Sequence, residues 1–83
     1  MKKSLQENHG HMRVVLGELS VGSCGRIELM RRFILKSSGG SPAVFDSVFA
    51  FLVFDGRVRK SGGDKRAPYC ITERGRLLLE ALS

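Results

Sequence analysis

The chain carries the sequence YCITERGRLLLEAL at residues 69–82. The first residues alternate, with Tyr69 and Ile71 on the same side, as in a short β-strand. Thr72 follows at a position suited to a helix N-cap, and leucines then recur at helical spacing in segment 77–82. The stretch therefore predicts a strand that passes directly into a closing helix.

Upstream of this strand, the glycine-rich segment 61–66 follows a second, weakly alternating segment at 57–60. Two short strands joined by such a loop indicate a β-hairpin. Gly56 precedes the hairpin, and we expect it to let the chain reverse in a left-handed conformation. Gly75 costs a helix about 1 kcal/mol against alanine, so we expect close backbone packing against the hairpin to require it.

Three helices are predicted before the hairpin. The first contains an apolar stripe at i, i+3, i+4 and i+7, formed by Met12, Val15, Leu16 and Leu19. The second covers residues 26–36, and the third covers residues 42–54, with Ser41 as its cap and Pro42 in its first turn. Propensity alone would allow a strand at 42–54, but the apolar period favours a helix. The fold class is mostly α with a small β-hairpin, in the order helix-helix-helix-strand-strand-helix.

Residues 1–11 are polar and lack periodicity, which predicts a disordered N-terminal arm or a cloning remnant. Residues 12–83 then form a single domain, as the length of 83 residues suggests. His9 and His11 both fall on the arm, so we expect no metal site there.

The charge is unevenly distributed. Fourteen lysines and arginines against eight acidic residues give a net charge of +6. Segment 57–76 alone holds seven basic residues against Asp64 and Glu73. A local excess of this kind favours a polyanionic partner such as nucleic acid.

Other classes of protein are less consistent with the sequence. The longest apolar run, 48–54, is far shorter than the roughly 18 residues of a membrane span, and no secretory signal is present. Cys24 and Cys70 lack zinc-ligand spacing, and two thiols are favoured over one disulfide. Because we find neither a membrane span nor a secretory signal, we expect a cytoplasmic protein. The histidines lie on the arm and the carboxylates are scattered among basic residues, so we expect no enzyme, cofactor, metal or small-molecule ligand.

Two sequence blocks make the chain resemble the winged helix-turn-helix family of bacterial and archaeal regulators. Such proteins often enter the wing with L-x-x-L-x-x-x-G-x-V, which here reads Phe49, Leu52, Gly56 and Val58. They often leave it with Y-x-L-T-x-x-G-x-x-L-L-x-x-L, which here reads Tyr69, Ile71, Thr72, Gly75, Leu78, Leu79 and Leu82. The resemblance covers roughly residues 12–83, and the second block is the more specific.

The resemblance implies binding to double-stranded DNA, with the third helix in the major groove and the basic wing on the phosphates. The candidate contacts lie on the second helix, the third helix and the wing: Arg26, Arg31, Arg32, Ser41, Ser47, Arg57, Arg59, Lys60, Lys65 and Arg66. A homodimer is common in the family, and Val53, Phe54 and Leu77 are the candidate interface residues.

The third helix departs from the family pattern, because its outward face has no Arg, Lys, Asn or Gln to read a base. Two alternatives therefore stay open. One is a transcriptional regulator of low sequence specificity that grips phosphates with its wing. The other is a protein-interaction module that uses the apolar outer face of this helix.

Overall fold

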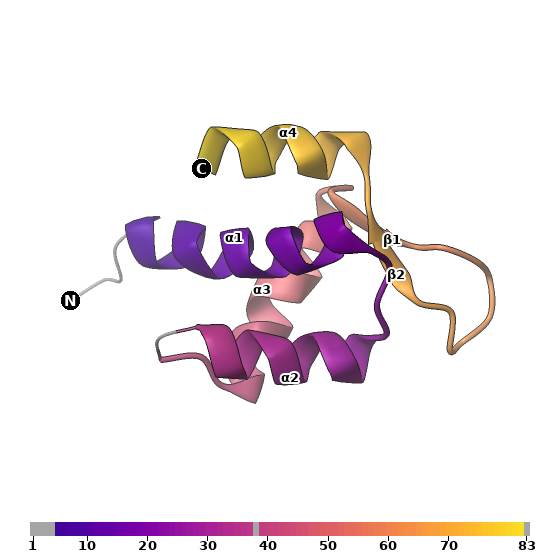
Figure 1. Cartoon of the computed structure of the whole chain (residues 1–83), viewed down its shortest axis with the longest axis horizontal. Helices are drawn as coiled ribbons and strands as arrows, with labels where there is room; N and C mark the ends of the chain where they lie inside the picture. The colour runs from indigo at the N-terminus through magenta and orange to yellow at the C-terminus, as the bar shows by residue number, and fades with distance from the viewer. Residues whose placement is uncertain (1–4, 38, 83) are drawn as a thin grey trace.

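The computed structural model describes residues 5–37 and 39–82. In chain order they form the four helices α1 (Leu5–Val21), α2 (Arg26–Lys36), α3 (Pro42–Phe54) and α4 (Glu73–Leu82), with strands β1 (Val58–Lys60) and β2 (Tyr69–Ile71) before α4. The expected arrangement, mostly helical with one small antiparallel hairpin, is confirmed. Figure 1 shows α1 running between α4 and α2, with the hairpin at one end of the molecule.

Local sequence signals set the ends of α3. The Ser41 hydroxyl accepts a hydrogen bond from the amide of Val44 at 3.2 Å, as an N-cap does, and Pro42 occupies the first turn. At the other end Gly56 has φ +77°, a left-handed conformation that favours glycine. Its conformation turns the chain out of α3 and into β1, as the sequence predicts.

The hairpin has one face toward the core and one face outward. Val58 pairs with Ile71 and both are buried, whereas the next pair in register, Arg59 with Cys70, lies on the opposite face. A third segment joins this sheet from the linker between α1 and α2. Cys24 donates its amide to the carbonyl of Tyr69 at 3.0 Å, and its own carbonyl accepts from the Tyr69 amide at 2.9 Å.

Aromatic rings connect the helices to the hairpin. The ring of Phe33 in α2 lies 5.5 Å from that of Phe45, which stacks 5.1 Å from Phe49 on the same helix. The Phe49 ring meets Tyr69 of β2 edge to face at 4.8 Å. Around this series the aliphatic core is built from all three of α1, α2 and α3 and from the hairpin, and α1 contacts α2, α3, α4 and β2. The core therefore fixes the hairpin relative to α2 and α3.

The N-terminal prediction is wrong for residues 5–11. They are the first turns of α1, which extends from Leu5 to Val21 instead of beginning near Met12. His11 is buried, and its ring lies 5.4 Å from the ring of Phe33 in an edge-to-face arrangement. Packing against α2 thus extends a helix that the polar composition alone does not favour. Residues 1–4 of the expected arm lie outside the described residues.

Gly75 is the point at which α4 meets the hairpin. A Cβ atom on this residue would lie 2.2 Å from the backbone oxygen of Arg57 and 2.8 Å from a side-chain carbon of Ile71. Thr72 secures the same junction, since its hydroxyl accepts from the Gly75 amide at 3.1 Å and donates to the Gly56 carbonyl at 2.8 Å. The predicted cap at Thr72 and the predicted close packing at Gly75 are therefore confirmed.

Gly75→Ala should destabilise the fold by about 2 kcal/mol, because the added methyl group would overlap a backbone oxygen, and moving the backbone away costs free energy. Gly17→Ala is the matched control, since Gly17 also lies within a helix but a methyl group added there would meet nothing within 4 Å. That variant should gain about 0.5–1 kcal/mol from helix propensity. Urea unfolding of both variants measures the difference, and equal effects of the two would contradict the close approach.

Candidate nucleic-acid interface

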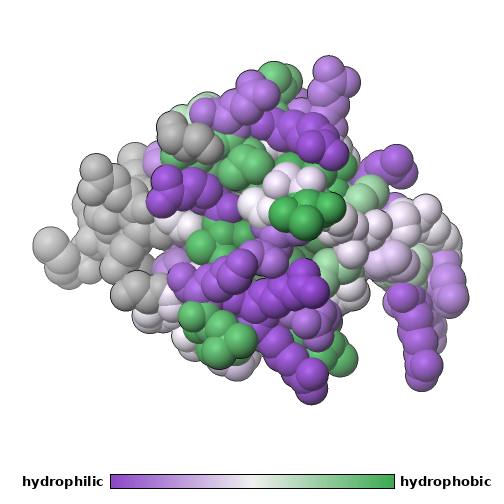
Figure 2. Space-filling view, viewed as in Figure 1, coloured by the Kyte–Doolittle hydropathy of each residue, from purple (hydrophilic) through white to green (hydrophobic). Residues whose placement is uncertain are grey.

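The tip of the hairpin and the start of α2 line one groove of about 430 Å³. Lys65, Arg66, Ala67 and Tyr69 form its hairpin side, and Gly25, Arg26, Ile27 and Glu28 form its α2 side. Figure 2 shows hydrophilic side chains projecting at the hairpin end of the molecule. The sequence did not predict this groove, which depends on the bridge between Cys24 and Tyr69.

Three of the predicted wing cations are exposed: Arg59, Lys65 and Arg66. Within residues 5–37 and 39–82, none of the three forms an ion pair. Lys60 is held more firmly, since its ammonium donates to the carbonyls of Asp64 at 3.5 Å and Lys65 at 3.3 Å. It also lies 5.9 Å from the centre of the Tyr69 ring. Lys60 therefore shapes the loop that presents the exposed cations.

Arg26 connects the groove to α3. Its guanidinium forms an ion pair with Asp46 and lies 5.7 Å from the ring centres of both Phe45 and Phe49. Asp46 is the only acidic residue in the α3 sequence, so this pair offsets the charge that would repel phosphate from that helix. No local pattern predicts the pair, because the two residues are 20 positions apart.

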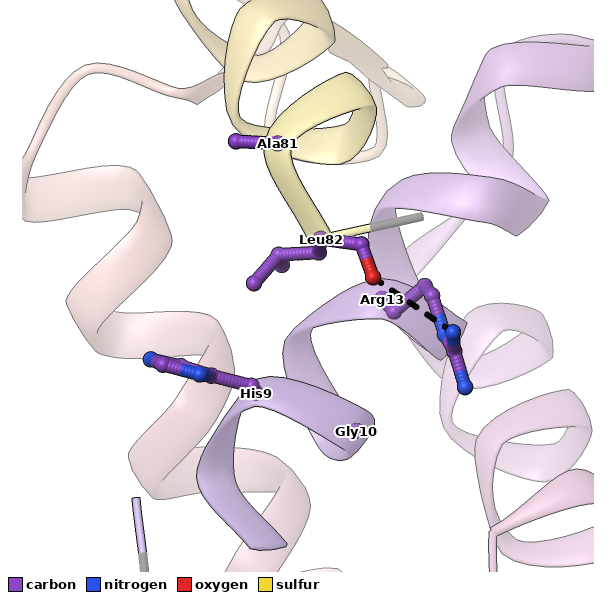
Figure 3. Close-up of a pocket in the computed structure, with 5 residues that line it drawn as sticks. All are labelled: His9, Gly10, Arg13, Ala81 and Leu82. Carbon is purple, nitrogen blue, oxygen red and sulfur yellow. Dashed lines mark hydrogen bonds between the residues drawn. The ribbon is translucent and has the colours of Figure 1, made fainter. Parts of the chain in front are cut away.

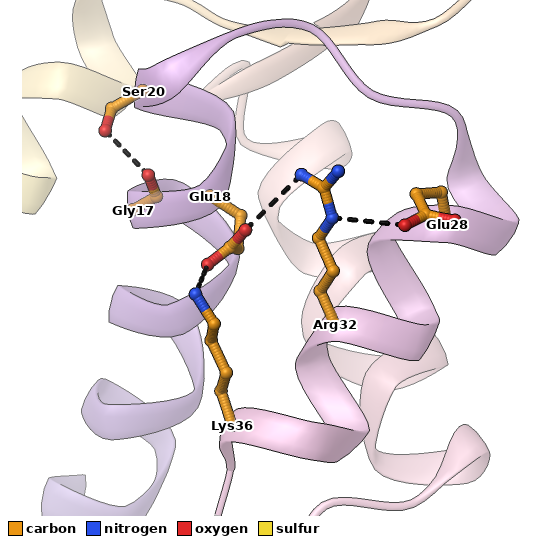
Figure 4. Close-up of polar contacts among 6 residues, drawn as sticks. All are labelled: Gly17, Glu18, Ser20, Glu28, Arg32 and Lys36. Atoms are coloured by element: carbon orange, nitrogen blue, oxygen red, sulfur yellow. Dashed lines mark hydrogen bonds and ion pairs between the residues drawn. The ribbon is translucent and has the colours of Figure 1, made fainter.

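The other predicted cations of α2 differ in their surroundings. Arg32 contacts Glu28, one helical turn earlier in α2, at 3.2 Å, and reaches Glu18 of α1 at 3.5 Å (Figure 4). Lys36 also forms an ion pair with Glu18, so both cations join α2 to α1. Arg31 is exposed and forms no ion pair with any part of the chain that the structure describes.

Arg57 lies at the base of the hairpin and is half-buried. Its guanidinium forms an ion pair with Asp55 and donates to the carbonyl of Arg74 at 3.3 Å. Arg74 in turn approaches the Asp55 carboxylate at 3.6 Å. Arg57 therefore joins the end of α3 to the start of α4, and its position differs from that of the exposed wing cations.

The outward face of α3 carries mostly small or apolar side chains, beside the exposed carboxylate of Asp46. Ala43, Ser47 and Ala50 are exposed along it, and its C-terminal end carries the larger exposed side chains of Phe51, Val53 and Phe54, with Phe54 90% exposed. Ser41 holds its capping position at the N-terminal end. Leu77, the third predicted interface residue, is 61% exposed on α4.

A second pocket lies between the N-terminal part of α1 and the end of α4 (Figure 3). It is lined by His9, Gly10, Arg13, Ala81 and Leu82, and the Arg13 guanidinium donates to the Leu82 carbonyl at 3.4 Å. This lining holds no carboxylate, hydroxyl or thiol, and His9 and Arg13 are its only titratable side chains. Across the described residues, no group of three His, Cys, Asp or Glu side chains is placed to hold a metal ion. Nor does any helix described here have the length and apolarity needed to cross a bilayer.

The two cysteines are free thiols in different environments. Cys24 is buried, and burial raises the pKa of its thiol, an effect that the Arg32 guanidinium opposes and the carboxylates of Glu28 and Glu18 reinforce. Cys70 is half-buried on the outward face of the hairpin, in register with Arg59. Cys24 pairs with Tyr69, the neighbour of Cys70, so the two thiols leave the sheet on opposite faces.

Iodoacetamide near pH 8 should therefore label Cys70 well before Cys24, because the thiolate is the reactive form and Cys24 holds its proton to higher pH. Mass spectrometry of the peptides measures the two rates. In urea, where both thiols are exposed, the rates should become similar. Equal labelling of the folded chain would contradict the burial of Cys24.

Comparison with protein-family models, with curated proteins and with solved structures found no match to this chain. The exposed cations of the hairpin, the groove beside α2 and the neutral face of α3 are the features that any function has to accommodate.

Proposed function

We propose that the chain is a winged helix-turn-helix domain that binds double-stranded DNA and acts as a transcriptional regulator, with the hairpin as its wing. The observation that carries the proposal is the groove in which Lys65 and Arg66 face the first turn of α2. Cations at such a position favour a phosphate, since releasing condensed counterions dominates the affinity of proteins for DNA.

The start of α2 supports the same partner. Its N-cap is Gly25, which has no side chain to accept hydrogen bonds from the amides of the first turn. These amides and the helix dipole favour an anion at this end of the helix. Arg26, which also lines the groove, adds a third positive charge, although its ion pair with Asp46 partly offsets it. Glu28 also lines the groove, and its carboxylate is paired with Arg32. A phosphate in the groove would therefore meet positive charge from the wing and from Arg26, with one paired carboxylate beside it.

The ion pairs separate the predicted DNA-contacting residues into those that can bind phosphate and those that stabilise the domain. We assign phosphate contacts to the wing cations Arg59, Lys60, Lys65 and Arg66, and a further contact to Arg31 on α2. Arg32 and Arg57 have carboxylate partners that join one helix to another, so we assign them to the stability of the domain. Ser41 and Ser47 remain candidate contacts from α3.

A second candidate function is the docking of another protein, or of a second copy of the chain, on exposed apolar side chains. The exposure of Phe54 and Leu77 favours it. The two functions differ in their response to salt, because apolar docking lacks the steep salt dependence of phosphate binding.

Binding to duplex DNA should weaken with salt along a line of log K against log salt whose slope is about −4.5, as expected for about five phosphate contacts. The double variant Lys65→Ala/Arg66→Ala should bind about 10- to 100-fold more weakly, equally for all sequences, with a slope shallower by about 2. Fluorescence anisotropy over a range of salt concentrations gives both quantities.

The double variant Arg32→Ala/Lys36→Ala is a control of equal charge change. Both of its cations pair with Glu18, so we expect lower stability but a largely unchanged salt slope. Circular dichroism confirms that each variant is folded at the temperature of the binding measurement. Absence of binding to any duplex at low salt would overturn the proposal and leave apolar docking as the function to test.

Asp46→Asn should strengthen binding about three- to tenfold and steepen the salt slope by about 1, because it removes a negative charge and releases Arg26 toward a phosphate. The same titration measures it, with Glu80→Gln on the exposed surface of α4 as the control for a lost carboxylate. Weaker binding by Asp46→Asn would show instead that the pair is needed to hold α3 in place.

A further inference from the structure

The exposed face of α3 can distinguish few chemical groups. Ala43, Ser47 and Ala50 follow one another at i, i+4 and i+7 and are all exposed, so they form one side of the helix. The helix contains no Arg, Lys, Asn or Gln, and its one carboxylate is paired with Arg26. Side chains that make bidentate hydrogen bonds to bases are thus absent from the α3 sequence.

The surface beside this face is cationic. Arg26 lines the groove together with Lys65 and Arg66, and it also forms the ion pair with Asp46 of α3. The edge of α3 that carries Asp46 therefore borders the groove in which we propose a phosphate binds. In the winged-helix arrangement that we propose, a duplex held there would present its major groove to α3, whose one carboxylate is paired with Arg26.

The base edges in the major groove present hydrogen-bonding groups and a single kind of apolar group, the 5-methyl of thymine. A serine hydroxyl accepts or donates with equal ease and distinguishes bases poorly. Apolar contact is therefore the main means of discrimination that Ala43 and Ala50 provide. The small size of the three side chains also allows the N-terminal part of α3 to approach the bases closely, whereas the exposed ring of Phe54 continues the same row at the C-terminal end.

We infer that the Ala43–Ser47–Ala50 face of α3 contacts thymine methyl groups, so that the domain prefers A·T-rich duplex through its major groove. The inference rests on the proposed function, to which it adds the class of DNA that is bound. Each thymine methyl group that becomes fully buried should raise the affinity about fourfold, which corresponds to the free energy of burying one CH₂ group in a protein.

Two matched pairs of duplexes test the inference. The first pair differs only by deoxyuridine in place of thymidine, which removes the methyl groups and keeps every hydrogen-bonding group. The second pair is G·C-rich and differs only by 5-methylcytosine in place of cytosine. We expect the methylated member of each pair to bind severalfold more tightly at the same salt concentration.

The variants Ala43→Gly and Ala50→Gly show which side chains contact the thymine methyl groups, because each variant removes only the side-chain methyl group of one alanine. Ala81→Gly, at an exposed position of α4, is the control for the loss of helix propensity. The ratio of thymine to uracil affinity should fall toward 1 in the α3 variants and stay unchanged in the control. The ratio is internal to each protein, so a change in the folded fraction cancels.

The outcomes separate the inference from the function on which it rests. Equal binding to thymine and uracil duplexes, with the salt slope intact, overturns the methyl contact and leaves phosphate binding in place. A thymine preference that survives both α3 variants overturns the assignment to this helix. No binding to any of the four duplexes overturns the proposed function itself.

Discussion

The backbone pairing of Cys24 with Tyr69 holds the rest of the arrangement in place. It ties the linker between α1 and α2 to the second strand of the hairpin through two hydrogen bonds. A hairpin of two three-residue strands has little stability alone. The bridge adds a third segment to the sheet, and the contact of Phe49 with Tyr69 packs that sheet against α3. The orientation of the wing relative to α2, and with it the cationic groove, depends on this pairing.

The cations behind the net charge of +6 divide into those that form ion pairs within the domain and those that do not. The Glu18 carboxylate forms ion pairs with Arg32 and Lys36 between α1 and α2. The Asp55 carboxylate forms an ion pair with Arg57 at the base of the hairpin. Pairs that are partly open to solvent add modest stability individually, but they determine which cations have a carboxylate beside them. Among the described residues of the hairpin, the cations without an ion pair are those at and near its tip. The positive charge of the hairpin that is left without a carboxylate partner is thus presented at one end of the folded molecule.

Most of the fold could be predicted from short-range signals. The cap at Ser41, the left-handed Gly56 and the cap at Thr72 each depend on residues within a few positions, and all three are confirmed. The start of α1 could not be predicted in this way. The polar residues before Met12 have no apolar period. The helix nevertheless extends through them, and His11 in this part of α1 is buried against the ring of Phe33. A contact between residues so far apart in the chain leaves no local signal.

The helix periods, the caps, the turns and the excess of positive charge in segment 57–76 can all be recognised in the chain, because they depend on neighbouring residues or on composition. Tertiary packing alone sets which cations pair across separate elements and which face solvent. The partners of Arg26 and Lys36 lie 20 and 18 positions away, and folding alone brings them together. The same long-range packing placed the tip of the hairpin beside the start of α2. The candidate binding surface consists of segments that are far apart in the sequence. Local sequence patterns do not specify which distant segments come into contact.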